Sequence, residues 1–328
     1  MRVLFFGSGE FAIPTLRSIA HDGHEIVMVV SQPDKRRGRG KDVTPTPLKR
    51  EALELGLPVV TPSDVNAADV VAHLLSLKAD LAYVAAFGQK IGPALLSGFP
   101  AGIVNLHASL LPALRGAAPI QWAVIRGLME TGVTIFRLVE KMDAGPILVQ
   151  RRTRIAPEET ADELHDRLSR IGCDAVRATL ELLSGEPTAP GTPQDASLVT
   201  YAPKLTKADG HIRFDMPAHE LACRICGLWS WPGAVCRFVS SDGKRDEQVT
   251  LARARAYDLR TRAAATPDEA GRINDMMRVQ TADAELEVLE IKPSGGRCMS
   301  WQDYVNGRHV REGDRFVPIA PDVAEGMR

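Results

Sequence analysis

The fold is set by the opening stretch Val3-Leu4-Phe5-Phe6-Gly7-Ser8-Gly9, in which an apolar run leads into small residues. An apolar run of this length predicts a short buried strand, and the small residues after it fit a tight turn into a helix. Similar apolar runs recur through the first half of the chain, with helical patterns between them. Such alternation predicts a parallel sheet with helices on both faces.

The expected fold class is α/β, with an N-terminal Rossmann-like, doubly wound parallel sheet followed by a different, smaller domain. The buried strands are expected at Val3–Phe6, Ile26–Val30, Leu81–Ala85 and Ile103–Leu106. Helices are expected at Pro47–Leu55, Ala67–Leu77 and Pro119–Leu128. Two further strands, at Thr131–Leu138 and Ile147–Ile155, are followed by a long helix at Glu159–Leu183 that closes the domain.

The composition shifts to Pro, Gly, Thr and Ser between residues 184 and 203, which is typical of a linker. Short alternating segments follow, and they predict a small C-terminal β-barrel of the OB-like kind. These segments are Val235–Val239, Val249–Tyr257, Met277–Thr281 and Leu286–Ile291. The predicted domains are therefore residues 1–188 for the sheet domain, 189–206 for the linker and 207–328 for the barrel.

The bulk composition excludes several classes of protein. The chain has 328 residues and a formal net charge of -1, so no global basic field indicates a nucleic-acid partner. Five irregularly spaced cysteines argue against a disulfide framework. Cys223 and Cys226 form a lone Cys-x-x-Cys in an expected helix, and we interpret them as structural because a metal needs about four ligands. No signal peptide or membrane span is recognisable, so a cytoplasmic protein is expected.

The sequence contains a dinucleotide-binding motif but lacks the other residues that such a site normally has. Gly7-Ser8-Gly9-Glu10-Phe11-Ala12 follows the first strand and matches Gly-x-Gly-x-x-Ala. The carboxylate that would bind the ribose is missing from the end of the second strand, at Ser31-Gln32, and Glu10 would place negative charge beside the pyrophosphate. A tight turn explains the glycines without any cofactor, so dinucleotide binding is the weaker interpretation.

A candidate catalytic set begins at the end of the fourth expected strand, where Asn105 and His107 stand two residues apart. Side chains alternate along a strand, so this amide and this imidazole share one face. Asn105 can donate to an oxyanion, and His107 can carry a proton near neutral pH. Asp143 follows in a second Gly/Pro-rich loop and supplies a carboxylate. These residue types fit acyl transfer without a metal, but spacing alone leaves a structural histidine and a turn-forming aspartate equally open.

A second candidate feature is a basic loop in the first half of the chain. Lys35, Arg36, Arg37, Arg39 and Lys41 lie within seven residues that contain no acidic side chain. Most charge runs are simply solvated, but this one follows a strand end, where ligands of open α/β sheets bind. It is therefore a candidate phosphate-binding arm.

The chain resembles the folate-dependent formyltransferase family, in particular the branch that formylates methionyl-tRNA. Asn105-x-His107 with Asp143 matches the catalytic trio of that family, and Ser109-Leu110-Leu111-Pro112 matches its folate-binding signature. The stretch from Arg115 to Gln121 is close to the version in the tRNA-acting branch. Further similarity lies in residues 32–41, 200–205 and 231–233. Phe87, where the family often has tyrosine, and Ala113-Leu114 depart from the pattern.

The resemblance implies formyl transfer from 10-formyltetrahydrofolate, as cosubstrate, to the α-amine of methionine on initiator tRNA. Asn105 and protonated His107 would stabilise the oxyanion, Asp143 would accept a proton from the amine, and no metal is required. The donor would lie along Ser109, Leu110, Leu111 and Pro112.

The tRNA contacts implied by the resemblance come from the basic loop and from the second domain. The expected residues are Arg36, Arg37, Arg39, Lys41 and Lys207. Arg253 and Arg255 share one strand face and are a weaker candidate, as is Lys204, while Phe11 fits a methionine pocket or the core equally well. The protein is expected to act as a monomer without a membrane.

Four other functions remain as alternatives. They are a sugar-nucleotide N-formyltransferase, a formyltetrahydrofolate hydrolase, a nicotinamide-dependent oxidoreductase and a non-catalytic RNA-binding module.

Overall fold

The computed structural model describes residues 1–37, 42–257 and 269–319, which form two compact units. The first unit contains Met1–Pro119, Glu130–Arg154 and His165–Ala202, and the second contains Ile120–Met129, Ile155–Leu164 and the chain from Pro203 onward. The domain boundaries at 188/189 and 206/207 stay a prediction. Two short segments of the first half, 120–129 and 155–164, pack with the second unit, which no composition shift in the sequence indicates.

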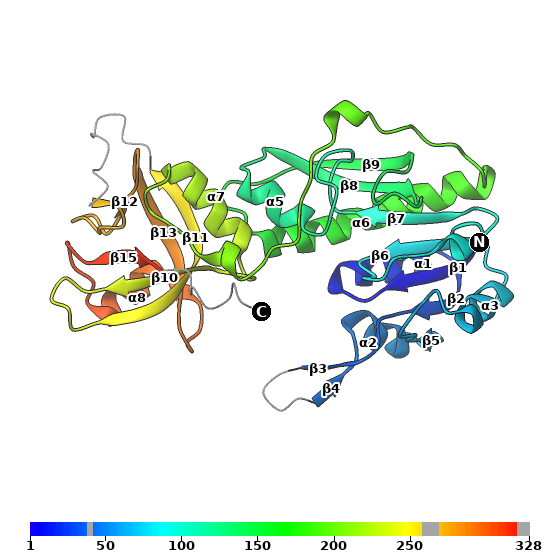
Figure 1. The fold of residues 1–328 in the computed structure, drawn as a ribbon, viewed down its shortest axis with the longest axis horizontal. Helices are drawn as coiled ribbons and strands as arrows, with labels where there is room; N and C mark the ends of the chain where they lie inside the picture. Colours follow the sequence, from blue (N-terminus) through cyan, green and yellow to red (C-terminus); the bar gives the residue numbers. More distant parts are fainter. Residues whose placement is uncertain (38–41, 258–268, 320–328) are drawn as a thin grey trace. The chain divides into compact units, whose positions relative to one another are not determined.

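The first unit is built on a seven-stranded sheet with the order β5-β2-β1-β6-β7-β8-β9 (Figure 1). Neighbouring strands from β5 to β7 are parallel, whereas β8 is antiparallel to β7 and β9 is antiparallel to β8. The strands are β1 Arg2–Gly7, β2 Glu25–Val30, β5 Val59–Val60, β6 Leu81–Ala85, β7 Ile103–His107, β8 Glu130–Arg137 and β9 Ile147–Arg154. The predicted α/β class is confirmed, and the hairpin β8–β9 carries the loop that contains Asp143.

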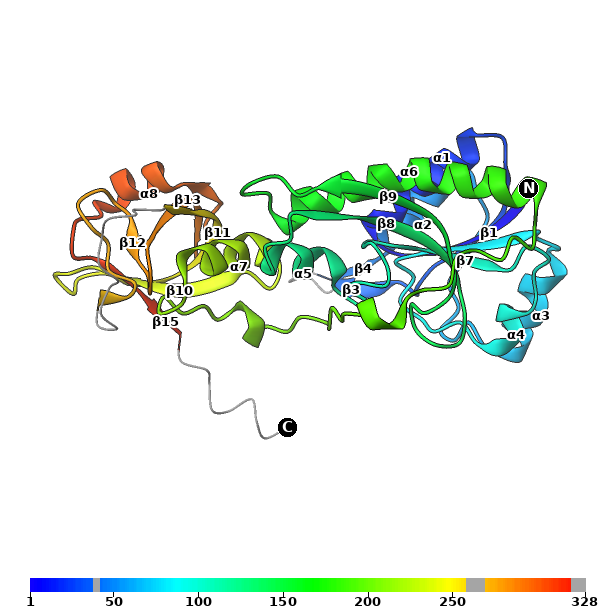
Figure 2. The same ribbon diagram turned by 90° about the horizontal axis from the view of Figure 1, so that it is seen from above.

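Helices cover both faces of this sheet, as the alternating pattern predicts. In Figure 2, α1 and α6 lie on one face and α3 and α4 on the other. The helical elements of the chain up to residue 185 are η1 Glu10–Ala12, α1 Ile13–His21, α2 Pro47–Glu54, α3 Ala68–Ser76, α4 Pro93–Leu96, α5 Pro119–Ile125 and α6 Ala161–Gly185. The single-turn α4 and the two-residue β5 are too short to leave a periodic signal in the sequence.

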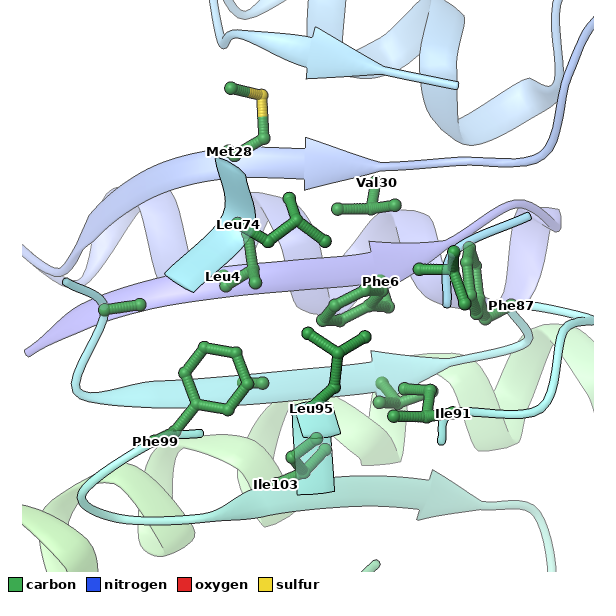
Figure 3. Close-up of a cluster of buried hydrophobic side chains, with 14 residues drawn as sticks. Leu4, Phe6, Met28, Val30, Leu74, Phe87, Ile91, Leu95, Phe99 and Ile103 are labelled. Carbon is green, nitrogen blue, oxygen red and sulfur yellow. The ribbon is translucent and has the colours of Figure 1, made fainter. Parts of the chain in front are cut away.

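The core follows from the alternation of side chains along the buried strands (Figure 3). Leu4 and Phe6 of β1 point to the face covered by α3 and α4, where they cluster with Leu74 and Leu95. Phe5 points to the opposite face, where its ring lies 5.1 Å from that of Tyr83. Because both faces are covered, β1 is apolar on both sides rather than alternating, which is why its sequence is a continuous apolar run.

The basic segment after β2 is a short hairpin where a loop was expected. Strand β3 (Lys35–Arg37) pairs antiparallel with β4 (Asp42–Thr44). Polar residues without alternation gave no strand signal, so the sequence could not predict this pairing.

The second unit is built on an antiparallel sheet with the order β12-β13-β11-β10-β15, with β14 beside β13. Its strands are β10 Ala234–Val239, β11 Asp246–Tyr257, β12 Val279–Gln280, β13 Glu285–Pro293, β14 Met299–Ser300 and β15 Arg315–Pro318. Its helices after the linker are η3 Ala208–Gly210, α7 Ala218–Leu228 and α8 Trp301–Arg308. No helix within the described ranges is both long and apolar enough to span a membrane.

The segment Gly271–Ile273 closes this sheet into a barrel. The amide of Gly271 donates to the carbonyl of Gln280 in β12, and the amide of Phe316 in β15 donates back to the carbonyl of Gly271. The two edge strands are thereby joined through one short segment, which removes the unpaired edges of an open sheet. The expected small barrel is confirmed.

We predict that Gly271→Ala destabilises the barrel more than Gly295→Ala. Both glycines have positive φ, +85° and +71°, so alanine should cost about 1–2 kcal/mol at each from backbone strain alone. At Gly271 an added Cβ would also clash with the carbonyl oxygen of Phe316, whereas at Gly295 it would meet nothing within 4 Å. Urea denaturation measures the difference, and equal losses of unfolding free energy would contradict the close approach.

Candidate active site

Asn105 and His107 lie at the carboxyl end of β7, where the sequence places them. Ile103 of the same strand belongs to the core cluster on the α3–α4 face, so alternation puts Asn105 and His107 on that face too. β7 is parallel to β6, and β6 is parallel to β1, so the carboxyl ends of these three strands meet at one edge of the sheet. Ligands of open α/β sheets bind at this edge.

The imidazole of His107 is buried, with 6% of the residue exposed, and both of its nitrogens face polar groups. Its Nε2 lies 2.9 Å from the carbonyl oxygen of Leu114. A carbonyl can only accept, so Nε2 carries a hydrogen and donates it there. Nδ1 is then the nitrogen that can gain or lose a proton, and it faces Oδ2 of Asp143 at 3.9 Å.

Asp143 is brought to His107 by the connection between β8 and β9. Its backbone has φ of +50°, a left-handed conformation that Asp tolerates better than most residues. The same Oδ2 that faces His107 accepts a hydrogen bond of 2.9 Å from the amide of Gly116. His107 and Asp143 therefore lie close together, although they are far apart in the sequence, and Asn105 shares the face of β7 that carries His107.

The Ser109–Pro112 segment is held in shape by β8 and β9. The hydroxyl of Ser109 donates to the carbonyl of Ala113 at 2.6 Å, and the amide of Leu111 donates to Thr134 Oγ1 at 3.0 Å. Gln150 donates from Nε2 to both the Leu111 carbonyl and the Thr134 hydroxyl, at 2.9 Å each. Ser109 and Leu111 are buried, whereas Leu110 and Pro112 are partly exposed.

Sequence reasoning missed the polar residues that hold this segment. Thr134 is fully buried and pairs with His107 across β7 and β8. Gln150 lies opposite Thr134 in β9. A buried threonine and a glutamine within expected strands were the available signals, but each is also an ordinary strand residue.

A cavity of about 450 Å³ opens at the carboxyl ends of β1, β2 and β6. Its wall combines hydroxyl, amide and charged groups, among them Ser8, Gln32, Thr46, Lys35, Glu10 and His165. Phe87 also lines it, but its side chain is buried against Phe6, with ring centroids 5.3 Å apart. Phe11 is buried too, and its ring lies 5.4 Å from that of His165, which places it in the core.

The glycine-rich turn after β1 is accounted for by packing. A Cβ on Gly7 would lie 2.7 Å from Leu48 Cδ2 and 2.8 Å from the carbonyl oxygen of Ala85. The amides of Ser8 and Gly9 donate to the carbonyl of Ala86, at 3.1 and 3.4 Å. These amides are the groups that would cradle a pyrophosphate in a dinucleotide site, and here the protein itself uses them.

The expected tRNA-contacting residues are only partly described. The backbones of Arg36 and Arg37 belong to β3, while Arg39 and Lys41 lie outside the described residues. Lys207 is exposed at the start of η3 in the second unit.

Two other basic residues of the second unit are already paired with carboxylates. Arg253 lies 2.7 Å from Glu163 and 3.2 Å from Glu290. Arg255 lies 2.8 Å from Glu287 and 3.4 Å from Glu158. The hydrogen bond from Arg253 lowers the pKa of Glu163. Their positive charges are thus compensated by carboxylates of the same unit, so less positive charge is available to bind a phosphate.

The Cys-x-x-Cys pair lies in α7, as expected. Cys226 is buried, and its thiol donates to the carbonyl of Ala254 at 3.5 Å. Burial raises the pKa of Cys226 to about 11 and also raises that of Cys223. Protonated, packed thiols fit the structural interpretation.

Comparison with solved structures agrees with the fold. The structure matches the sugar 3N-formyl transferase WlaRD with a TM-score of 0.62 at 15% identity, over 88% of this chain and 97% of that one. It matches a variant of HypX from Aquifex aeolicus with a TM-score of 0.60 at 16% identity, over 95% of this chain and 48% of that one.

Sequence comparison is more specific. Residues 1–180 match the Formyl transferase family model, and residues 204–309 match the Formyl transferase C-terminal domain model. The methionyl-tRNA formyltransferase of Moorella thermoacetica is 38% identical over 96% of this chain and 98% of its own length. That of Heliobacterium modesticaldum is 39% identical over 96% of this chain and 100% of its own length. The chain therefore belongs to the formyl transferase family and is an enzyme of formyl group transfer.

Proposed function

We propose that the protein transfers the formyl group of 10-formyltetrahydrofolate to the α-amine of methionyl initiator tRNA, for translation initiation. The observation that carries the proposal is that His107 Nδ1 and Asp143 Oδ2 lie 3.9 Å apart, beside the strand face that also carries Asn105. The relatives that match over nearly their whole length bear the name methionyl-tRNA formyltransferase. This name indicates methionyl-tRNA as the acceptor of the formyl group, which the three side chains alone do not specify.

The first chemical step needs a group that stabilises negative charge. The α-amine attacks the formyl carbon, forming the new C–N bond, and the carbonyl oxygen becomes an oxyanion in a tetrahedral intermediate. The side-chain amide of Asn105 can donate to that oxygen, as can His107 when its Nδ1 is protonated. Removal of one such donor typically costs about 10²–10³ in kcat.

The remaining steps move two protons. The attacking nitrogen becomes positively charged and must lose a proton, which Asp143 accepts at its carboxylate. The bond from carbon to N10 then breaks, and N10 takes up a proton from His107. Because Nε2 is engaged by Leu114, Nδ1 is the nitrogen that gives up this proton, and Asp143 beside it can restore it.

The folate is assigned to the Ser109–Pro112 segment. Ser109 and Leu111 are occupied within the fold, so Leu110 and Pro112, which are partly exposed, are the side chains left to contact the donor. Ser109 and Leu111 would shape this surface from beneath.

The tRNA is assigned to the basic hairpin and to Lys207. In this proposal Arg36, Arg37, Arg39 and Lys41 contact phosphates of the acceptor arm. The cavity of about 450 Å³ borders Lys35 of β3 and lies at the same sheet edge as His107, so it is the candidate entrance for the aminoacyl end. We further propose that the enzyme acts as a monomer in the cytoplasm.

The function is tested by following labelled formyl groups from 10-formyltetrahydrofolate in the presence of charged initiator tRNA. The proposal requires label in N-formylmethionyl-tRNA, with uncharged tRNA inactive because it lacks the amine. Label released as formate at the same rate without tRNA would indicate a hydrolase. Transfer to an amino-sugar nucleotide instead would indicate the sugar-modifying alternative.

Asp143→Asn and His107→Ala should each lower kcat by about 10²–10⁴ while leaving folate affinity within about threefold, since acid–base groups act on the chemical step. Glu140→Gln is the matched control, because it removes an exposed carboxylate from the same β8–β9 connection. Single-turnover formylation and folate titration measure the two effects. Near-normal turnover in either variant would show that the assigned role is wrong.

Arg39→Ala should raise KM for methionyl-tRNA and reduce the slope of log kcat/KM against log salt by about 0.7–0.9, the contribution of one phosphate contact. The KM for 10-formyltetrahydrofolate should not change. Lys78→Gln, at the turn before β6 and therefore at the opposite edge of the sheet, removes a charge without this effect. An unchanged salt slope in Arg39→Ala would show that Arg39 makes no phosphate contact.

A further inference from the structure

The segment that follows α6 returns to the catalytic edge of the first unit. The backbone of Thr192 exchanges two hydrogen bonds with Ile147 of β9, at 2.8 and 2.7 Å. Further on, Arg115 and Tyr201 form a second backbone bridge, in which the amides of Arg115 and Ala202 donate to Thr200 and Arg115. The residues between these two attachments therefore connect the start of β9 to the loop that contains Arg115.

Gln194 lies between the two attachments, and its side chain makes four hydrogen bonds. Its Nε2 donates to the carbonyls of Asp143 and Gly145, at 2.9 and 2.7 Å. Its Oε1 accepts from Nη2 and Nε of Arg115, at 2.6 and 3.1 Å. Carbonyls only accept and guanidinium groups only donate, so the orientation of this amide is determined, and its donors and acceptor are fully used.

The partners of Gln194 are the residues that hold the catalytic side chains. Arg115 stands between Leu114, whose carbonyl accepts from His107, and Gly116, whose amide donates to Asp143. Gln194 fixes the side chain of Arg115 on one side and the backbone of Asp143 on the other. One amide therefore joins the loop that fixes the imidazole to the loop that carries the carboxylate.

These loops need an external attachment because their backbones are strained. Leu114 and Asp143 have φ of +59° and +50°, and Gly116 has φ of +124°. Non-glycine residues in this region are strained and persist only where the surroundings impose the conformation. Arg115 is 7% exposed, and within the described residues no carboxylate lies at ion-pair distance from it, so Gln194 is its side-chain acceptor.

We propose that Gln194 is a positioning residue that sets the distance between His107 and Asp143. The proposal rests on the proposed function, since it assigns Gln194 an effect exerted through those two side chains. Gln194 touches neither of their reacting groups. Its loss would remove the attachment to the Asp143 backbone and leave the hydrogen bond from the Gly116 amide to Asp143 to join the two loops, and a displacement of about 1 Å is enough to cost up to about 100-fold in rate.

Two substitutions separate the functions of the amide. Gln194→Met keeps the length of the side chain and removes all four hydrogen bonds. Gln194→Glu keeps an acceptor for Arg115 but turns the donor toward Asp143 and Gly145 into an acceptor. Ser197→Ala is the matched control in the same segment, because the amide and the hydroxyl of Ser197 donate to Asp195 Oδ1, at 2.8 and 2.7 Å, and not to the loops that carry His107 or Asp143 within the described residues.

We expect both Gln194 variants to lower kcat at least about tenfold. KM for either substrate should stay within about threefold, and Ser197→Ala should stay within about twofold of the parent. A merely structural glutamine would instead change thermal stability or KM without this selective loss of kcat. If Gln194→Met does not fold, Gln194→Glu, which still pairs with Arg115, carries the test.

A double-mutant cycle with Asp143→Asn decides whether Gln194 positions Asp143 or is merely structural. If Gln194 acts through Asp143, its substitution lowers the residual kcat of Asp143→Asn by less than about twofold, because interacting residues are not additive. An equal loss in both backgrounds, or no loss in the parent, overturns the proposal. Failure of the proposed function would appear earlier and separately, as a parent enzyme that does not formylate methionyl-tRNA or as a fully active Asp143→Asn.

Discussion

The hydrogen bond from His107 Nε2 to the carbonyl of Leu114 is the interaction on which the site depends. It fixes the ring of a buried imidazole and commits one nitrogen to donation, so that the other nitrogen is left to exchange protons. Leu114, whose carbonyl accepts this bond, adopts a left-handed backbone conformation with φ of +59°. Chemistry at Nδ1 is therefore set by a loop conformation rather than by the strand that carries His107.

The sheet brings together groups that the chain keeps apart. β7 carries Asn105 and His107, and the β8–β9 connection, which the strand register places beside the amino end of β7, reaches back so that Asp143 Oδ2 lies 3.9 Å from His107 Nδ1. Thr134 and Gln150 of that hairpin also hold Leu111 in place. The two antiparallel strands that extend the parallel sheet thus support both the carboxylate and the segment assigned to the folate.

The sequence predicted the parts of this arrangement that depend on local pattern. Alternation in β7 placed Asn105 and His107 on one face, and the apolar runs located four of the parallel strands, β1, β2, β6 and β7, but not the two-residue β5. It could not predict Gln194, because a glutamine in a polar segment has no periodic signal and its partner Arg115 is 79 residues away. The β3–β4 pairing and the closure of the barrel through Gly271 were also missed, since both depend on contacts between residues without apolar alternation.

The central claim is that Nε2 of His107 is committed to the carbonyl of Leu114, which leaves Nδ1 for the proposed proton transfer, and its most direct test is nitrogen NMR of the imidazole. Long-range proton–nitrogen correlations distinguish a protonated ring nitrogen from an unprotonated one. The structure predicts that neutral His107 carries its hydrogen on Nε2, where it donates to the carbonyl of Leu114. A neutral ring with the hydrogen on Nδ1 would contradict the account, because Nε2 would then have no hydrogen to donate to Leu114.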